Sequence, residues 1–203
     1  MNWLAHAFLS EDDVEFQIGN VLADPLKGKV WQSASDGIIK GMKTHVLIDV
    51  FTDSHQVVSK SKSRLRERGL LKAVVIDITY DYFLTKHWHK YSSISKDDFL
   101  VKFNDEARSH FPQYPEQAKI MVESLVKENR LDKYNTLSQL RDAFVRIDTR
   151  LSPKLLAREN TLSYFDRVCE IELDLEEDFL NFFPALYKYI KAQLDPQKLR
   201  HWK

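Results

Sequence analysis

The amino-acid sequence predicts an all-α fold, a single-domain helical bundle over residues 1–203. The chain contains only 5 glycines and 6 prolines, which is few for a loop-rich or all-β protein. No proline lies between Pro25 and Pro112, so this stretch can form long helices. A length of 203 residues is typical of one domain with a sizeable hydrophobic core.

Capping residues and helix-breaking residues indicate where the helices begin and end. We expect a first long helix to begin at Ser35-Asp36, to continue into the 60s and to end near Gly69. A second helix should cover Leu71–His89. Its β-branched run would also fit a strand, but the apolar character continues to Leu84 without a turn signal, and this length favours a helix. Further helices are expected over residues 95–111, 116–128, 136–150 and 162–194, with Pro184 inside the last.

Composition and charge exclude several classes of function. Lys+Arg and Asp+Glu both total 30, so the net charge is zero and gives no global reason to expect a nucleic-acid partner. The single cysteine, Cys169, excludes an internal disulfide and a zinc site of several thiolates. The N-terminal segment lacks the basic start of a secretory signal, and no run approaches the roughly 18 apolar residues of a membrane span. We therefore expect a cytoplasmic protein without a membrane or nucleic-acid partner.

The first candidate site lies on the first long helix. His45, Asp49 and Asp53 are spaced four residues apart, which nearly completes a helical turn, so they share one stripe. Imidazole and carboxylate groups one turn apart can bind a single divalent cation. The alternative is a solvated polar face with a salt link within the helix, and the spacing alone leaves both open.

The second candidate is a pair of carboxylates on the second helix. Asp77 and Asp81 lie one turn apart in a segment that is apolar on nearly every face, which indicates a buried helix. A buried ionised carboxylate is costly unless it is paired or binds a metal, and two on one stripe also repel each other. A shared cation resolves both problems, and so does an arginine in a polar core network.

Three further residues are weaker candidates. His6 lies in the apolar segment NWLAH, where a histidine is also a common core or capping residue. Asp24 precedes Pro25 and would equally suit a helix end. His87 follows the helix of Asp77 and Asp81, where the helix dipole by itself favours a histidine.

A basic run follows the first candidate site. Lys60, Lys62, Arg64, Arg66 and Arg68 are accompanied by only one acidic residue, Glu67. The run is either a solvated helix end or a docking patch for an acidic partner or a phosphate. The sequence has no phosphate-binding loop, dinucleotide fingerprint or nucleophile elbow, so metal-assisted hydrolysis has the most support among reaction classes.

Four segments together resemble the acyl carrier protein phosphodiesterases, also called acyl carrier protein hydrolases. They are NWLAH at residues 2–6, GNVLAD at 19–24, G-x-x-x-H-x-x-x-D-x-x-T-D at 41–53 and D-x-x-x-D-x-F-L-x-x-H-W at 77–88. The resemblance covers the motifs of the N-terminal half in order. It implies an all-helical fold distantly similar to the HD phosphohydrolases, although this chain has no adjacent His-Asp doublet.

The resemblance also implies a reaction and a cofactor. The enzyme would cleave the phosphodiester that joins 4′-phosphopantetheine to a serine of holo acyl carrier protein, with a divalent cation, usually Mn²⁺. Carboxylate and imidazole ligands suit Mn²⁺, Mg²⁺ or Fe²⁺ better than a thiolate-selected metal. Acyl carrier proteins are acidic, so the basic run offers a complementary dock.

We accordingly assign roles as hypotheses. Most of the metal ligands would be Asp24, His45, Asp49, Asp77 and Asp81, with His6 as a weaker candidate ligand. The proton donor to the leaving serine would be His87 or His6, and Asp53 would orient a ligand. Two alternatives stay open. One is a non-catalytic module that binds acidic carrier proteins, and the other is a metal phosphodiesterase that acts on a different small phosphodiester. The oligomeric state is not predicted.

Overall fold

The structure is a computed structural model that describes all 203 residues, and it is built from α-helices. In chain order they are α1 (Trp3–Phe8), α2 (Val14–Leu22), α3 (Asp36–Ser54), α4 (Gln56–Leu65), α5 (Lys72–Lys86), α6 (Trp88–Tyr91), α7 (Lys96–His110), α8 (Glu116–Lys127), α9 (Leu137–Asp148), α10 (Pro153–Leu156), α11 (Phe165–Glu170) and α12 (Glu172–Lys191). There is no strand, only an isolated bridge between Ser92 and Trp202. The prediction of an all-α fold is therefore confirmed, whereas the more specific likeness to HD phosphohydrolases stays a prediction.

Several helices begin where their capping residues predict. The Ser95 hydroxyl accepts the backbone N–H of Asp98 at the start of α7, and the Thr136 hydroxyl accepts that of Gln139 at the start of α9. Such a cap satisfies one of the backbone donors that a helix leaves free in its first turn. Helices α5, α7, α8 and α9 lie within the predicted ranges, although the helix expected over Leu71–His89 ends at Lys86 and α6 begins at Trp88.

Two of the predicted long helices are each divided. The first ends at Ser54, because His55 has an extended backbone and its side chain accepts the N–H of Val57 to begin α4. The predicted C-terminal helix is divided at Ile171 into α11 and α12, and α12 continues through Pro184. Neither break coincides with a glycine or a proline, so the sequence alone did not predict them.

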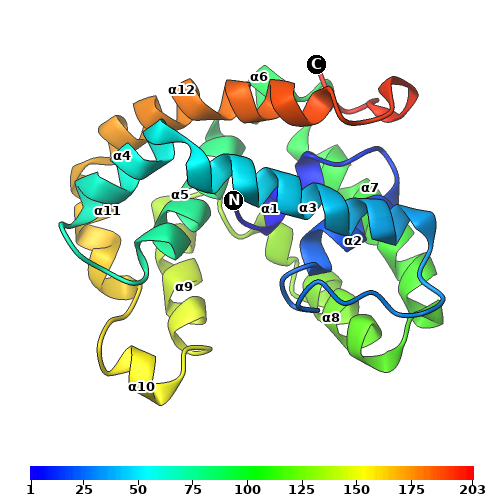
Figure 1. Cartoon of the computed structure of the whole chain (residues 1–203), viewed down its shortest axis with the longest axis horizontal. Coiled ribbons are helices and arrows are strands. Elements are labelled where there is room, and N and C mark those ends of the chain that lie inside the picture. The colour runs from blue at the N-terminus through cyan, green and yellow to red at the C-terminus, as the bar shows by residue number, and fades with distance from the viewer.

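Helix α12 covers one side of the molecule along α4 and α3, as Figure 1 shows in orange above cyan. Its aromatic residues Phe179, Phe182 and Phe183 are fully buried in the core. The N-terminal helix α1 lies inside the molecule among the surrounding helices (Figure 1), and five of its six residues are buried. No helix combines the length and the apolar character that crossing a membrane requires.

Helices α2 and α3 pack closely against each other, because glycines face the partner helix on both of them. A Cβ on Gly41 would lie 2.1 Å from the carbonyl oxygen of Phe16, and one on Gly19 would lie 2.3 Å from that of Ile38. No side chain larger than hydrogen fits at such distances. The contact brings the polar residues of α2 within hydrogen-bond distance of those on α3.

Candidate metal centre

His45 on α3 is held by the backbone of α2. Its Nδ1 lies 2.7 Å from the carbonyl oxygen of Asn20, which can only accept, so Nδ1 carries the proton. In the neutral ring the lone pair is then on Nε2. This arrangement is typical of metal-binding histidines, whose second ring nitrogen donates to a carbonyl or carboxylate oxygen.

His6 on α1 is held by the same asparagine, through its side chain. Asn20 donates from Nδ2 to the hydroxyl of Ser10, 3.0 Å away, so its Oδ1 is the acceptor that faces His6 Nδ1 at 2.8 Å. A neutral His6 with its proton on Nδ1 presents an unprotonated Nε2, and this atom also lies 3.2 Å from the carbonyl oxygen of Met1. The two imidazole rings stack with centroids 4.1 Å apart, and both are almost completely buried.

Carboxylates face the two Nε2 atoms. Asp49 lies 3.0 Å from His45 Nε2 through one oxygen and 3.3 Å from His6 Nε2 through the other, and Asp24 lies 3.2 Å from His45 Nε2. Despite these distances, neither oxygen lies along an Nε2–H direction of His45, and this buried nitrogen has no hydrogen-bond partner. A lone pair that faces carboxylate oxygens requires a proton or a cation between them.

The electrostatics of the group favour positive charge. Burial by itself would lower the pKa of His45, but Asp24 and Asp49 outweigh it and raise the pKa to about 9. Burial by itself would raise the pKa of Asp49, yet contacts with His45 and His6 hold it well below its usual value. The contact with His45 likewise lowers the pKa of Asp24. Burial lowers the pKa of His6, which keeps its ring neutral and able to act as a ligand.

The donor set fits a divalent metal ion. One ligand atom each from His6, His45 and Asp49 lie within 4.8 Å of one another, and Asp24 adds a carboxylate from an exposed position. Imidazole and carboxylate donors without thiolate suit Mn²⁺, Fe²⁺ or Zn²⁺, and the unpartnered Nε2 of His45 is the atom that such an ion would satisfy. His6, which the sequence suggested both as a proton donor and as a weaker candidate ligand, lies in this group.

Asp77 and Asp81 are not brought into the same group. Asp81 is fully buried and accepts the backbone N–H groups of Leu4 and Ala5, at 2.9 and 3.3 Å, so it caps the first turn of α1. Burial raises its pKa to about 7 against these hydrogen bonds. Asp77 accepts a hydrogen bond of 3.0 Å from the Met1 amino group, which also lies 3.9 Å from Asp49.

Two other predicted site residues lie elsewhere. Asp53 is exposed on α3 and forms an ion pair with Lys62 at 2.9 Å. His87 faces Glu176 of α12, which also contacts Lys86. Each has an ionic partner of its own, and neither makes a contact with His6, His45 or Asp49.

The predicted basic patch is largely neutralised within the molecule. Lys60 and Arg64 contact the buried Asp178 of α12 at 3.0 and 2.8 Å. Arg66 donates to the carbonyl oxygen of Ser163 and lies over the ring of Tyr164. Arg68 lines a shallow surface pocket beside Gly69 and forms no ion pair.

Asn20 is the residue that sequence reasoning missed. It orients both histidines, one through its side chain and one through its backbone carbonyl, and it is fully buried. The signal that could have found it is a lone amide in the apolar segment IGNVLA, because a buried amide must find hydrogen-bond partners.

The fold and the site define an all-helical protein with a buried His/Asp group suited to a divalent cation. A family model of the acyl carrier protein phosphodiesterases matches residues 1–186. The chain therefore belongs to the acyl carrier protein phosphodiesterase family, whose members are phosphoric diester hydrolases.

Relatives that carry this name match along nearly the whole chain. The one from Yersinia pestis is 26% identical over 190 residues, which is 93% of this chain and 96% of the relative. The one from Pectobacterium atrosepticum is 27% identical over 95% of this chain and 99% of its own length. The one from Escherichia coli O6:H1 is 28% identical over 92% and 95%, respectively. No solved structure matches the chain.

Proposed function

We propose that this protein is a metal-dependent phosphodiesterase that removes 4′-phosphopantetheine from holo acyl carrier protein and releases the apo protein. The name of its relatives supports the substrate. The observation that carries the metal dependence is the grouping of His6, His45 and Asp49, whose ligand atoms lie within 4.8 Å of one another, with Asp24 beside them.

His6, His45 and Asp49 would hold the metal ion, with Asp24 as a fourth ligand. We propose Mn²⁺, with Mg²⁺ or Fe²⁺ as alternatives, in keeping with the mixed imidazole and carboxylate donors. When bound, such an ion promotes the ionisation of water and neutralises negative charge that develops on the phosphate. Asn20 fixes both imidazoles in the tautomer that leaves Nε2 free.

The leaving serine oxygen requires a proton. A ligand nitrogen must be unprotonated, so His6 cannot hold the metal ion and donate this proton at the same time. His87 is engaged by Glu176 on another side of α5. We therefore assign proton delivery to solvent on the side of Asp24, whose side chain is 78% exposed.

Asp77 and Asp81 would support the site by positioning the residues around His6 rather than by binding the metal ion. Asp81 fixes the start of α1, which carries His6, and Asp77 holds the Met1 amino group beside Asp49. Loss of either carboxylate would displace His6 relative to His45. Of the basic run, Arg68 is left free to contact the acidic carrier protein.

The experiment incubates purified holo acyl carrier protein with the metal-loaded enzyme and measures the intact mass of the carrier protein. We expect a loss equal to one phosphopantetheine, dependent on Mn²⁺ and abolished by a chelator. The variant His45→Ala should abolish the loss, whereas Asp53→Asn, on the same helix but outside the metal group, should retain it.

An unchanged carrier mass under every divalent ion, with folded protein, would reject this function. Turnover of other phosphodiesters would then identify a different small substrate. Carrier-protein binding without turnover would identify a non-catalytic module.

A further inference from the structure

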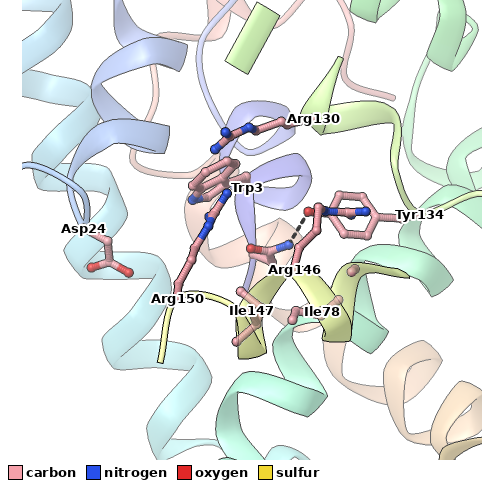
Figure 2. A pocket seen from close by; sticks show the side chains of 10 residues that line it. Trp3, Asp24, Ile78, Arg130, Tyr134, Arg146, Ile147 and Arg150 are labelled. Carbon is pink, nitrogen blue, oxygen red and sulfur yellow. Dashed lines mark hydrogen bonds between the residues drawn. The ribbon is translucent and has the colours of Figure 1, made fainter. Parts of the chain in front are cut away.

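A pocket of about 200 Å³ lies next to the proposed metal centre and is lined by arginines. Figure 2 shows Trp3 between Arg130 and Arg150, with Asp24 on one side of this group and Arg146 and Tyr134 on the other. The side chains come from α1, from the turn after α8 and from the C-terminal part of α9. Asp24 lines this pocket and also contacts His45 Nε2 at 3.2 Å, so the pocket adjoins the centre.

The positive charge in this pocket is not balanced by the protein. Arg130 is paired with Glu128, with Nε and Oε2 2.9 Å apart. Arg146 and Arg150 form neither an ion pair nor a side-chain hydrogen bond, although both line the pocket. Burial lowers the pKa of Arg150 and the charge of Arg130 lowers it further, while Glu128 acts in the opposite direction. Three arginines line the pocket against one carboxylate, Asp24, and Arg146 and Arg150 have no acidic partner of their own, so the pocket favours an anion; phosphate matches the geometry of a guanidinium best.

Trp3 holds two of these guanidinium groups in place. The guanidinium carbons of Arg130 and Arg150 lie 5.6 and 5.9 Å from the centre of the Trp3 ring. Arginines that contact an aromatic face lose less conformational freedom when they bind an anion. Trp3 belongs to α1, three residues before His6, so the arginine pocket and the metal centre share one short helix.

An apolar pocket of about 340 Å³ continues from the arginine pocket. The two share Trp3, Arg130 and Arg150. The remaining apolar lining consists of Val21, Leu22, Pro25, Ile120, Met121 and Leu125. A ligand that fills both pockets therefore combines an anionic head next to the arginines with a long arm that presents apolar groups to the second pocket.

We propose that Arg146 and Arg150, supported by Arg130 and Trp3, form a subsite that holds the phosphate of a phosphate monoester while its organic arm lies in the apolar pocket. This inference rests on the proposed function, because cleavage of the carrier phosphodiester on the serine side yields such a monoester. The subsite would select substrates by the arm that follows the phosphate. It would also make the enzyme sensitive to inhibition by its own product.

The test measures binding rather than turnover, by titration calorimetry on the full chain with a chelator present. The probes are 4′-phosphopantetheine, pantetheine without phosphate, and inorganic phosphate. We expect 4′-phosphopantetheine to bind at least about tenfold more tightly than either of the others, because only it fills both pockets. The double variant Arg146→Ala/Arg150→Ala should lose at least about tenfold in affinity for 4′-phosphopantetheine and much less for pantetheine, which has no phosphate but whose pocket Arg150 also lines.

Two controls isolate the subsite from general charge and from folding. Arg141→Ala removes an exposed arginine from the same helix, α9, outside the pocket, and should leave all affinities unchanged. Ile120→Gln alters the exposed edge of the apolar pocket and should weaken pantetheine and 4′-phosphopantetheine alike. Thermal unfolding of each variant verifies the fold.

Equal affinity of the double variant and the parent protein for 4′-phosphopantetheine would overturn the proposal, and so would equal binding of the phosphorylated and unphosphorylated arms. Tight, arginine-dependent binding without any hydrolysis of holo carrier protein would reject the proposed function and leave the subsite standing. Hydrolysis without arginine-dependent binding would reject the subsite alone.

Discussion

Two of the buried polar clusters in this protein, around Asp178 and around Asp49, differ in the groups that face the carboxylate. Around Asp178, every neighbour is a donor: Ser61 at 2.9 Å, Arg64 at 2.8 Å and Lys60 at 3.0 Å. Tyr80 completes the chain through the Ser61 hydroxyl. Around Asp49, the neighbours are imidazole nitrogens whose protons are directed elsewhere, to Asn20.

The difference teaches how to separate structure from function in a buried polar group. The Asp178 network has donors enough to satisfy its buried carboxylate, and its role is to join α4, α5 and α12. The His/Asp group instead brings ligand atoms of two imidazoles and a carboxylate within 4.8 Å of one another, and these donor types bind divalent cations. We therefore expect substitutions in the first group to change stability and substitutions in the second to change metal binding and activity.

The largest expected effect is that of His45→Ala. Removal of this imidazole should lower the hydrolysis rate by about 100- to 1,000-fold, because the contribution of a bound metal ion is worth several kcal/mol. The variant should also lose the rise in melting temperature that Mn²⁺ gives the parent protein. A Mn²⁺-dependent stabilisation of His45→Ala equal to that of the parent would contradict the assignment of His45 as a ligand.

The next effect is that of Asn20→Ala, which removes the hydrogen bond to His6 but leaves the backbone bond to His45. We expect metal affinity to fall by about 10- to 100-fold, the range found when outer hydrogen-bond partners of ligands are removed. Ser10→Ala, which removes only the hydroxyl that accepts from Asn20, should have a smaller effect. Both affinities follow from Mn²⁺ titration, and an unchanged affinity in Asn20→Ala would mean that His6 needs no positioning.

The Asp178 network should respond in the opposite way. Asp178→Ala leaves Ser61 and Arg64 without their buried acceptor and should lower the free energy of unfolding by about 1–3 kcal/mol. Asp174→Ala, which removes an exposed partner of Arg64, should cost no more than about 0.5 kcal/mol. Denaturant unfolding measures both. A loss of Mn²⁺ affinity in Asp178→Ala, with the fold retained, would break the distinction between the two groups.

The parts of this site that lie on one helix could be predicted from the sequence, whereas the contacts between helices could not. His45 and Asp49 could be paired because one helix fixes their separation. The role of Asp81 could not be foreseen, because a buried carboxylate that accepts backbone N–H groups of another helix has the same sequence pattern as one that binds metal. The role of Asn20 depends on the close packing of α2 on α3, which two separate glycines permit.

The arginine pocket shows the same limit at longer range. Arg130, Arg146 and Arg150 are scattered among ordinary surface charges in the sequence, whereas the dense run at residues 60–68 attracted the prediction. In the structure Lys60 and Arg64 of that run contact Asp178 of α12, whereas the unpaired Arg150 lies beside Trp3. Charge density in a sequence is therefore a poor guide to free charge on a surface, because pairing is decided by tertiary contacts.

The smallest expected effect is the pH dependence of the metal-free protein. The folded pKa of His45 is raised from 6.5 to about 9, so protonated His45 stabilises the fold fully below pH 6.5, and this contribution is lost as the pH rises through about 9. The Met1 amino group, also raised from its ordinary value, acts in the same direction, so His45→Ala should flatten the decline only in part. Melting temperatures between pH 6 and 10 with a chelator present measure the decline. Mn²⁺ affinity should instead increase across this range, because the ion displaces the proton of His45. Parallel profiles of melting temperature against pH for the parent protein and His45→Ala would show that the charge on His45 does not couple to folding.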